Sequence, residues 1–165
     1  MDTIIRTPQP HLLETNLQET YLRFQLEQHT PAILAVEYVQ EVLIVPTRRL
    51  TPMPNMPKYM LGLLNRRNRV LWVIDLAKML NLQAFDADTR QYNIAIVQVG
   101  QVSLGLVVHA VKDVTRFTRD RVQSVQGLVT TALAPYLHGC ILQQKEIMLV
   151  LNAEAIVHSL ALHSN

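Results

Sequence analysis

Five arginines in two short segments are the residues best suited to bind another molecule. Arg66, Arg67 and Arg69 lie in a basic turn between two apolar runs, and Arg48 and Arg49 lie in the loop before it. The planar guanidinium group can donate two parallel hydrogen bonds to a carboxylate or a phosphate. A solvated polar turn explains such a cluster equally well. The residues alone therefore leave open a contact for an anionic partner and a simple surface turn.

Little in the sequence suggests catalysis. There is no phosphate-binding glycine-rich loop and no serine elbow. His158 and His163 are five positions apart, which puts them on different faces of a helix and disfavours a zinc site. Asp75 could serve as a general base, but its place between a strand and a helix favours a capping role. We therefore expect a non-enzymatic protein without a metal or cofactor.

The basic turn is predicted to join two strands. Residues 60–64 and 70–74 are apolar, and the β-branched and aromatic residues of the second run suit a buried strand. Asp75 follows as a helix N-cap, with Leu76 and Met79 at helical spacing.

The same design returns near the C-terminus. Four positions of the first segment match four of the second at one offset of 77: Tyr59 with Tyr136, Gly62 with Gly139, Val73 with Val150, and Asp75 with Asn152. Asp and Asn are the residues that cap helices best, so the match has physical content. Residues 35–42 resemble 107–114 at an offset of 72, and residues 21–26 resemble 92–97. We expect one unit used twice, at about 20–82 and 91–160, after a tail at 1–19.

Further strands are predicted where apolar residues alternate or β-branched residues gather. These segments are residues 21–26, 32–36, 42–45, 93–99 and 102–108, with a helical turn at 118–122 and an amphipathic helix at 153–162. About ten short strands with few helices favour two small β-barrels over a sheet with crossover helices.

Bulk properties limit the classes of protein. Each half alone would bury only about 60% of its unfolded surface, so the halves are expected to share a core. The formal charge of +2 gives no global attraction to nucleic acid. The single cysteine, Cys140, lies in an apolar run and is expected to be a buried, reduced thiol, which fits the cytoplasm. No apolar run is long enough to cross a bilayer and no signal peptide is recognisable, so direct membrane insertion is not expected.

Four segments, arranged along the chain in the same order as in the family, resemble motifs of the CheW-like proteins, the coupling proteins of bacterial chemotaxis. Residues 55–76, NMPKYMLGLLNRRNRVLWVIDL, resemble the family signature N-x-P-x-y-v-x-G-v-x-N-L-R-G-x-v-x-P-V-x-D-L. Residues 36–42, VEYVQEV, resemble its I-x-x-V-Q-E-I, and residues 104–114 resemble its v-G-l-v-V-D-x-V-x-x-V. Residues 136–152 resemble its last motif. The resemblance covers about residues 20–160.

This resemblance implies a mainly β fold of two five-stranded, SH3-like barrel subdomains, at about 20–82 and 91–160, related by a pseudo-twofold axis. It also implies a cytoplasmic adaptor that couples the cytoplasmic tip of a methyl-accepting chemoreceptor to a CheA-type histidine kinase. Arg67 takes the place of the Arg in the family signature. With the rest of the basic turn, the expected partner-binding residues are Val39, Gln40, Glu41, Val42, Arg66, Arg67, Arg69, Gly105, Val107 and Val108. The expected caps are Asp75 and Asn152.

Three positions depart from the family pattern. Asn68 replaces a Gly, Trp72 replaces a Pro and His109 replaces an Asp. Asn is the residue that best tolerates the positive φ a Gly allows. The departures favour a specialised paralogue, serving phototaxis or type IV pilus motility. As an alternative, a small barrel with an Arg66, Arg67 and Arg69 turn could bind single-stranded nucleic acid, although only 5% of the residues are aromatic.

Overall fold

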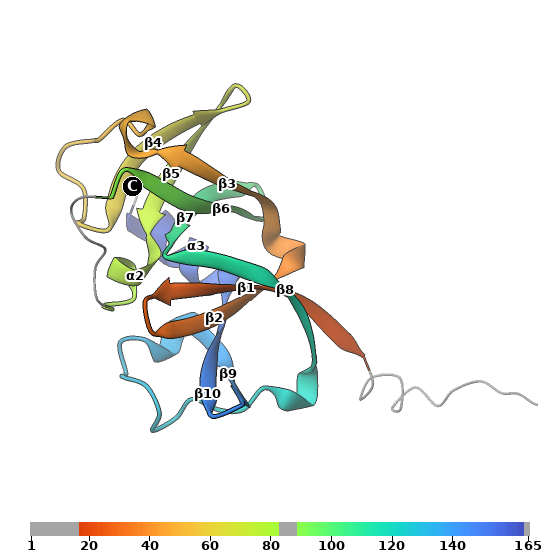
Figure 1. Cartoon of the computed structure of the whole chain (residues 1–165). Helices are drawn as coiled ribbons and strands as arrows, with labels where there is room; N and C mark the ends of the chain where they lie inside the picture. Colours follow the sequence, from red (N-terminus) through yellow and green to blue (C-terminus); the bar gives the residue numbers. More distant parts are fainter. Residues whose placement is uncertain (1–16, 83–88, 164–165) are drawn as a thin grey trace, which may run out of the picture.

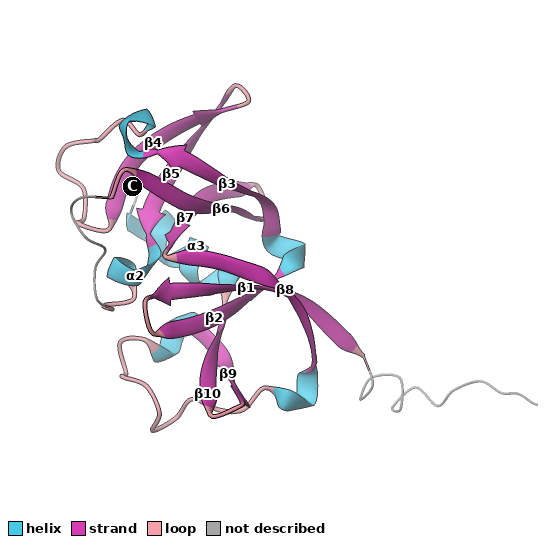
Figure 2. Cartoon of the chain, in the orientation of Figure 1, coloured by secondary structure: helices cyan, strands magenta, loops and turns pink. Residues whose placement is uncertain are grey.

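The computed structural model describes residues 17–82 and 89–163. These residues form two curled β-sheets (Figure 2). The predicted tail at 1–19 lies almost entirely outside the described residues. In chain order the strands are β1 (Gln18–Glu27), β2 (Thr30–Ala35), β3 (Val39–Pro46), β4 (Met60–Arg66), β5 (Arg69–Asp75), β6 (Gln91–Val99), β7 (Val102–Val108), β8 (Ala110–Thr118), β9 (Leu137–Gln143) and β10 (Glu146–Leu151). The helices are α2 (Leu76–Met79) and α3 (Ala153–His163), and short 3-10 turns are η1 (Val36–Tyr38), η2 (Thr47–Arg49), η3 (Arg119–Arg121) and η4 (Ala134–Tyr136).

Each sheet contains five strands. Sheet A has the strand order β8-β1-β2-β10-β9, and sheet B has the order β3-β6-β7-β5-β4. Figure 1 shows sheet B above sheet A. The predicted mainly β architecture with two five-stranded units and few helices is confirmed.

Each sheet closes on itself through one short bridge. In sheet B, the chain after β3 reaches the opposite edge strand β4, where Thr51 and Leu63 exchange two backbone hydrogen bonds of 2.8 and 2.9 Å. In sheet A, Gln123 and Cys140 exchange the same two bonds at the same lengths. The backbones meet so closely here that a side chain on Gly62, which has a φ of +142°, would lie 2.3 Å from the Thr51 carbonyl oxygen. This close approach explains why both copies of the repeat have a glycine here, Gly62 and Gly139.

The sheets do not coincide with the two halves of the chain. Sheet A combines β1 and β2 of the first half with β8, β9 and β10 of the second, while sheet B combines β3, β4 and β5 with β6 and β7. The two halves thus exchange their first hairpins. This corrects the assignment of one barrel to residues 20–82 and the other to 91–160. Sequence similarity marks the copied unit, whereas strand pairing decides which barrel each strand enters.

Equivalent residues of the two copies make equivalent pairs. Each sheet contains one parallel pair, β2 with β10 in sheet A and β7 with β5 in sheet B. In these pairs Ile33 lies opposite Val150, and Gly105 lies opposite Val73. Ile33 corresponds to Gly105 at the sequence offset of 72, and Val150 corresponds to Val73 at the offset of 77, so the two pairs are equivalent. The duplication is thus visible in strand register as well as in residue types.

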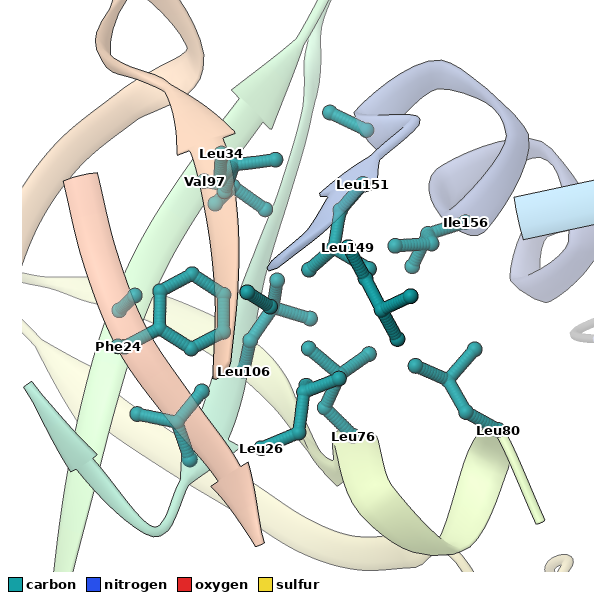
Figure 3. Close-up of a cluster of buried hydrophobic side chains, with 14 of the residues drawn as sticks. Phe24, Leu26, Leu34, Leu76, Leu80, Val97, Leu106, Leu149, Leu151 and Ile156 are labelled. Atoms are coloured by element: carbon teal, nitrogen blue, oxygen red, sulfur yellow. The ribbon is translucent and has the colours of Figure 1, made fainter. Parts of the chain in front are cut away.

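Three apolar clusters follow from the alternation of side chains along the strands. One fills sheet B and includes Val73, Ile94 and Ile96, and a second fills sheet A and includes Ile33. The largest lies between the sheets and takes side chains from both, from α2 and from α3 (Figure 3). There the fully buried Leu106 belongs to a strand of sheet B, while several of its neighbours belong to sheet A. Burying a leucine of this kind stabilises the fold by about 1.5–3 kcal/mol, so the shared core holds the barrels together as expected.

Most predicted elements are present with small shifts at their ends, but β8 was not predicted. Of its nine residues only Phe117 is buried, and Lys112, Asp113 and Arg116 are exposed. Such a polar strand lacks the alternation on which strand prediction depends. Among the described residues no helix has the length and apolar character needed to cross a membrane.

Candidate partner-binding site

The basic turn is a two-residue hairpin between β4 and β5. Arg66 pairs with Arg69, and the two residues between them, Arg67 and Asn68, have φ values of +52° and +64°. Positive φ at both positions defines the tight turn whose twist matches that of the flanking strands. Asn68 adopts this conformation readily, as expected for the residue that replaces a Gly. An Arg does so only at a cost in strain, so the strain in this turn is concentrated at Arg67.

The turn meets β3 through a carboxylate. Glu41 accepts hydrogen bonds from the Nε and Nη2 atoms of Arg66, and the Nη2 atom of Arg67 lies 3.7 Å from its Oε1 atom. The hydrogen bond from Arg66 is the main cause that lowers the pKa of the Glu41 carboxyl below its usual value. The Arg67 side chain is 76% exposed, against 36% for Arg66. Arg66 therefore neutralises Glu41, and Arg67 extends toward solvent.

These side chains surround a hollow of about 200 Å³, which we call the arginine notch. It is lined by Gln40, Glu41, Arg66, Arg67, Arg69, Leu71 and Ile96. Arg69 also donates to the Ser103 Oγ atom at 2.8 Å, which fixes its direction. Three arginines and one glutamate give the notch a formal charge of +2. The structure thus brings five of the predicted partner-binding residues into one site.

The other predicted residues lie elsewhere. Val42 is exposed on the outer face of β3, and Val39 packs against the core between the sheets. Gly105, Val107 and Val108 are interior: the two valines are 1% and 2% exposed. The burial of these three residues in the central strand β7 leaves them no exposed surface for the partner contact that was expected of them.

Arg48 and Arg49 form part of η2 and are exposed, but neither lines the notch. His109, which replaces the family's Asp, donates its backbone N–H to the Gln25 carbonyl oxygen at 2.8 Å. Its own carbonyl oxygen accepts from the Asn93 side chain at 3.0 Å. Because the backbone makes both contacts, they do not require a particular side chain at position 109.

A second, mostly apolar hollow of about 140 Å³ lies where α3 meets β5 and β7, and we call it the apolar hollow. Its lining residues are Met60, Trp72, Val102, Ser103, Leu104, Val157 and Leu160. Trp72 is half-buried: it packs against the core between the sheets and also lines this hollow. The place of Val157 and Leu160 in this hollow could not be predicted from the sequence, since helical periodicity indicates only that they face inward.

The two predicted caps have the expected geometry. The Asp75 carboxylate accepts the Lys78 backbone N–H at 3.2 Å, and the Asn152 side chain accepts the Ala155 backbone N–H at 3.0 Å. Asp75 is only 2% exposed, and this burial raises the pKa of its carboxyl. A buried carboxylate that caps a helix is a structural group, which agrees with the sequence-based preference. Cys140 is fully buried, and burial raises the pKa of its thiol.

The sequence and the fold of this chain are similar to those of known proteins. The family profile described as "CheW-like domain" matches residues 20–161. A probable chemotaxis protein CheW of Rhizobium etli is 32% identical over 106 residues, covering 64% of this chain and 68% of that protein. The chemotaxis protein CheW of Treponema pallidum is 26% identical over 119 residues, covering 70% of each chain. Among solved structures, the scaffolding protein TtCheW of Thermoanaerobacter tengcongensis superposes with a TM-score of 0.72 at 22% identity, covering 82% of this chain and 90% of that one.

Proposed function

Because the chain belongs to the CheW-like domain family, we propose that it couples a chemoreceptor to a CheA-type histidine kinase through two separate surfaces. Members of this family are scaffold and adaptor proteins and not enzymes, so the chain is a non-enzymatic adaptor of a chemotaxis system. The observation that supports a role in binding is the arginine notch, which gathers residues from β3, β4 and β5.

The two hollows differ in chemistry, and we assign them to different partners. The notch is polar and has net positive charge, which suits the charged surface of a globular kinase domain. The apolar hollow is lined by α3 and two strands, which suits the apolar face of an amphipathic helix at the receptor tip. Coupling then results from relative positioning of the two partners, since this chain makes and breaks no covalent bond.

Cellular location and motility system follow from the same proposal. The protein would lie in the cytoplasm and reach the receptor arrays only through its partners. We propose a specialised paralogue, serving phototaxis or pilus motility, because Trp72 lines the apolar hollow at a position where the family pattern has Pro. Deleting the gene should then impair one of those responses while swimming chemotaxis is retained; loss of swimming chemotaxis alone would contradict this assignment.

Nucleic-acid binding is not proposed. Among the described residues no aromatic side chain lines the arginine notch, so they offer bases no stacking surface there. The relatives described above are chemotaxis proteins.

The coupling proposal is tested with purified components. The full chain is added to the CheA-type kinase and the receptor cytoplasmic fragment of the same organism, and autophosphorylation is measured with and without receptor. Receptor control of the kinase should require this chain. A kinase that neither binds the chain nor changes its activity in its presence would refute the proposal.

A further inference from the structure

The two barrels have ends that are built in the same way, and only the end in sheet B carries arginines in its hairpin. The notch residues Gln40 and Glu41 correspond to Lys112 and Asp113 at the offset of 72. Arg66, Arg67 and Arg69 correspond at the offset of 77 to Gln143, Gln144 and Glu146. Five positions with a formal charge of +2 thus match five positions with a charge of −1.

The second hairpin forms the same tight turn without arginines. Gln144 and Lys145 have φ values of +48° and +67°, close to those of Arg67 and Asn68. Asp113 is paired with Arg23 of β1, at 2.9 and 2.6 Å, and not with the hairpin beside it. The barrel end in sheet A therefore folds without arginines at the three equivalent positions. The need to fold thus does not explain why the notch in sheet B has them.

The arrangement of charges within the notch favours an anionic group as its ligand. Glu41 accepts from both Nε and Nη2 of Arg66, which neutralises the one negative charge of the site. Arg67 is left with a 3.7 Å contact and a largely exposed guanidinium group, and Arg69 is held in place by its hydrogen bond to the Ser103 side chain. The two arginines offer a pair of cationic donors at the edge of a small cavity.

We propose that the arginine notch binds an acidic side chain of the kinase, with Arg67 and Arg69 as direct contacts and Arg66 as a positioning residue. Arg66 holds Glu41, which would otherwise draw in Arg67 and repel the incoming carboxylate. The notch is too small and too weakly charged for a phosphate backbone, which needs a continuous basic track. This inference rests on the proposed coupling function.

A set of variants separates direct contact from positioning. Binding of the soluble CheA-type kinase of the same organism is measured by calorimetry for the full chain. Arg67→Gln should raise the dissociation constant about tenfold, since it removes a charge-assisted contact. Arg66→Gln should weaken binding to a similar degree, because Glu41 then captures Arg67. Glu41→Gln should tighten binding about threefold, and the double variant Arg66→Gln with Glu41→Gln should recover the affinity lost in Arg66→Gln.

Matched controls come from the other barrel end. Lys112→Gln and Glu146→Gln change charges at positions equivalent to Gln40 and Arg69, and neither should alter the affinity for the kinase. The Glu41 carboxyl can also be titrated by NMR in the free chain. Its pKa should rise part of the way toward the usual value in Arg66→Gln, because the approach of Arg67 replaces only part of the lost hydrogen bonding, and should change less in Arg67→Gln.

Several results would overturn the inference while leaving the coupling function intact. They are an unchanged affinity in Arg67→Gln, a double variant as weak as Arg66→Gln, a larger pKa change in Arg67→Gln than in Arg66→Gln, or notch-dependent binding of a single-stranded oligonucleotide in place of the kinase. Failure of the native chain itself to bind the kinase would instead refute the coupling function.

Discussion

Asp75 and Asn152 cap two helices in the same way, although one is a buried acid and the other a neutral amide. Each lies at the C-terminal end of a strand that pairs in parallel with the exchanged hairpin, and the side chain of each accepts the backbone N–H three residues later. The backbone N–H groups of the two caps also donate to the backbone carbonyl oxygens of the equivalent residues Tyr59 and Tyr136, both at 2.8 Å. Asn152 thus shows that a neutral amide can cap the helix at the position equivalent to Asp75.

We predict that Asp75→Asn stabilises the protein at neutral pH. Burial raises the pKa of the Asp75 carboxyl, so its stabilising contribution is complete below the unfolded value of 3.8 and is lost as pH rises through the folded value. The Asn variant keeps the cap and removes this loss. Urea unfolding should show a larger free energy of unfolding at neutral pH, with the advantage disappearing as pH falls toward 3.8.

Asp75→Ala is the matched control, because it removes the ionisable group and the cap together. It should be less stable than Asp75→Asn by about 1 kcal/mol. An Asn variant that is less stable than the native chain at neutral pH would show that the carboxylate is required.

Tyr21 should destabilise the protein in alkaline solution. Burial first, and then the hydrogen bond to Glu19, raises the pKa of Tyr21 to about 12. The folded chain keeps the phenol protonated, while the unfolded chain ionises near 10.0, so stability falls as pH rises between these values. Tyr21→Phe should lose less stability over this interval in urea unfolding. Equal losses in the native chain and the variant would contradict this prediction.

Gly62→Ala should be strongly destabilising. The new Cβ atom would lie 2.3 Å from the Thr51 carbonyl oxygen, at a φ of +142°, where the barrel closes. Strain and clash together should cost about 3 kcal/mol or more, measured by thermal or urea unfolding. Gly100→Ala is the control: its φ is +60° but it faces open space, so its cost should be about 1 kcal/mol. Similar losses at both sites would show that the close approach is unimportant.

Arg67→Asn should separate stability from binding. Asn tolerates the positive φ at this turn better than Arg, so the free energy of unfolding should rise by about 1 kcal/mol. Kinase binding should weaken, because the exposed guanidinium group is lost. Gln144→Asn, at the equivalent turn, should give a comparable gain in stability with unchanged kinase affinity. Weaker binding in both variants would show that turn geometry, and not charge, matters.

Local chemistry made some of the structure predictable. The cap at Asp75, the turn at Asn68 and the match between Gly62 and Gly139 follow from backbone preferences that act over a few residues. The same is true of the basic hairpin, which the structure places where the sequence indicated.

Pairing over long distances was not predictable. The residue types do not determine that Ile33 lies opposite Val150 and not opposite Val73, because the two copies offer nearly the same apolar partners. The contact between Glu41 and Arg66 depends on the closure of sheet B, and the burial of Val107 and Val108 depends on the central place of β7. Such features are decided by tertiary packing of surfaces that look alike in sequence.

The exchange of hairpins has a consequence for synthesis on the ribosome. Sheet B needs strands up to β7 and can close once residue 108 has emerged, whereas sheet A must wait for β10, which ends at residue 151. The hairpin of β1 and β2 is made first but belongs to the barrel that is finished last. Until then its apolar residues must remain uncovered or rest on the first barrel, so this hairpin waits for the rest of its sheet while residues 36–151 are synthesised.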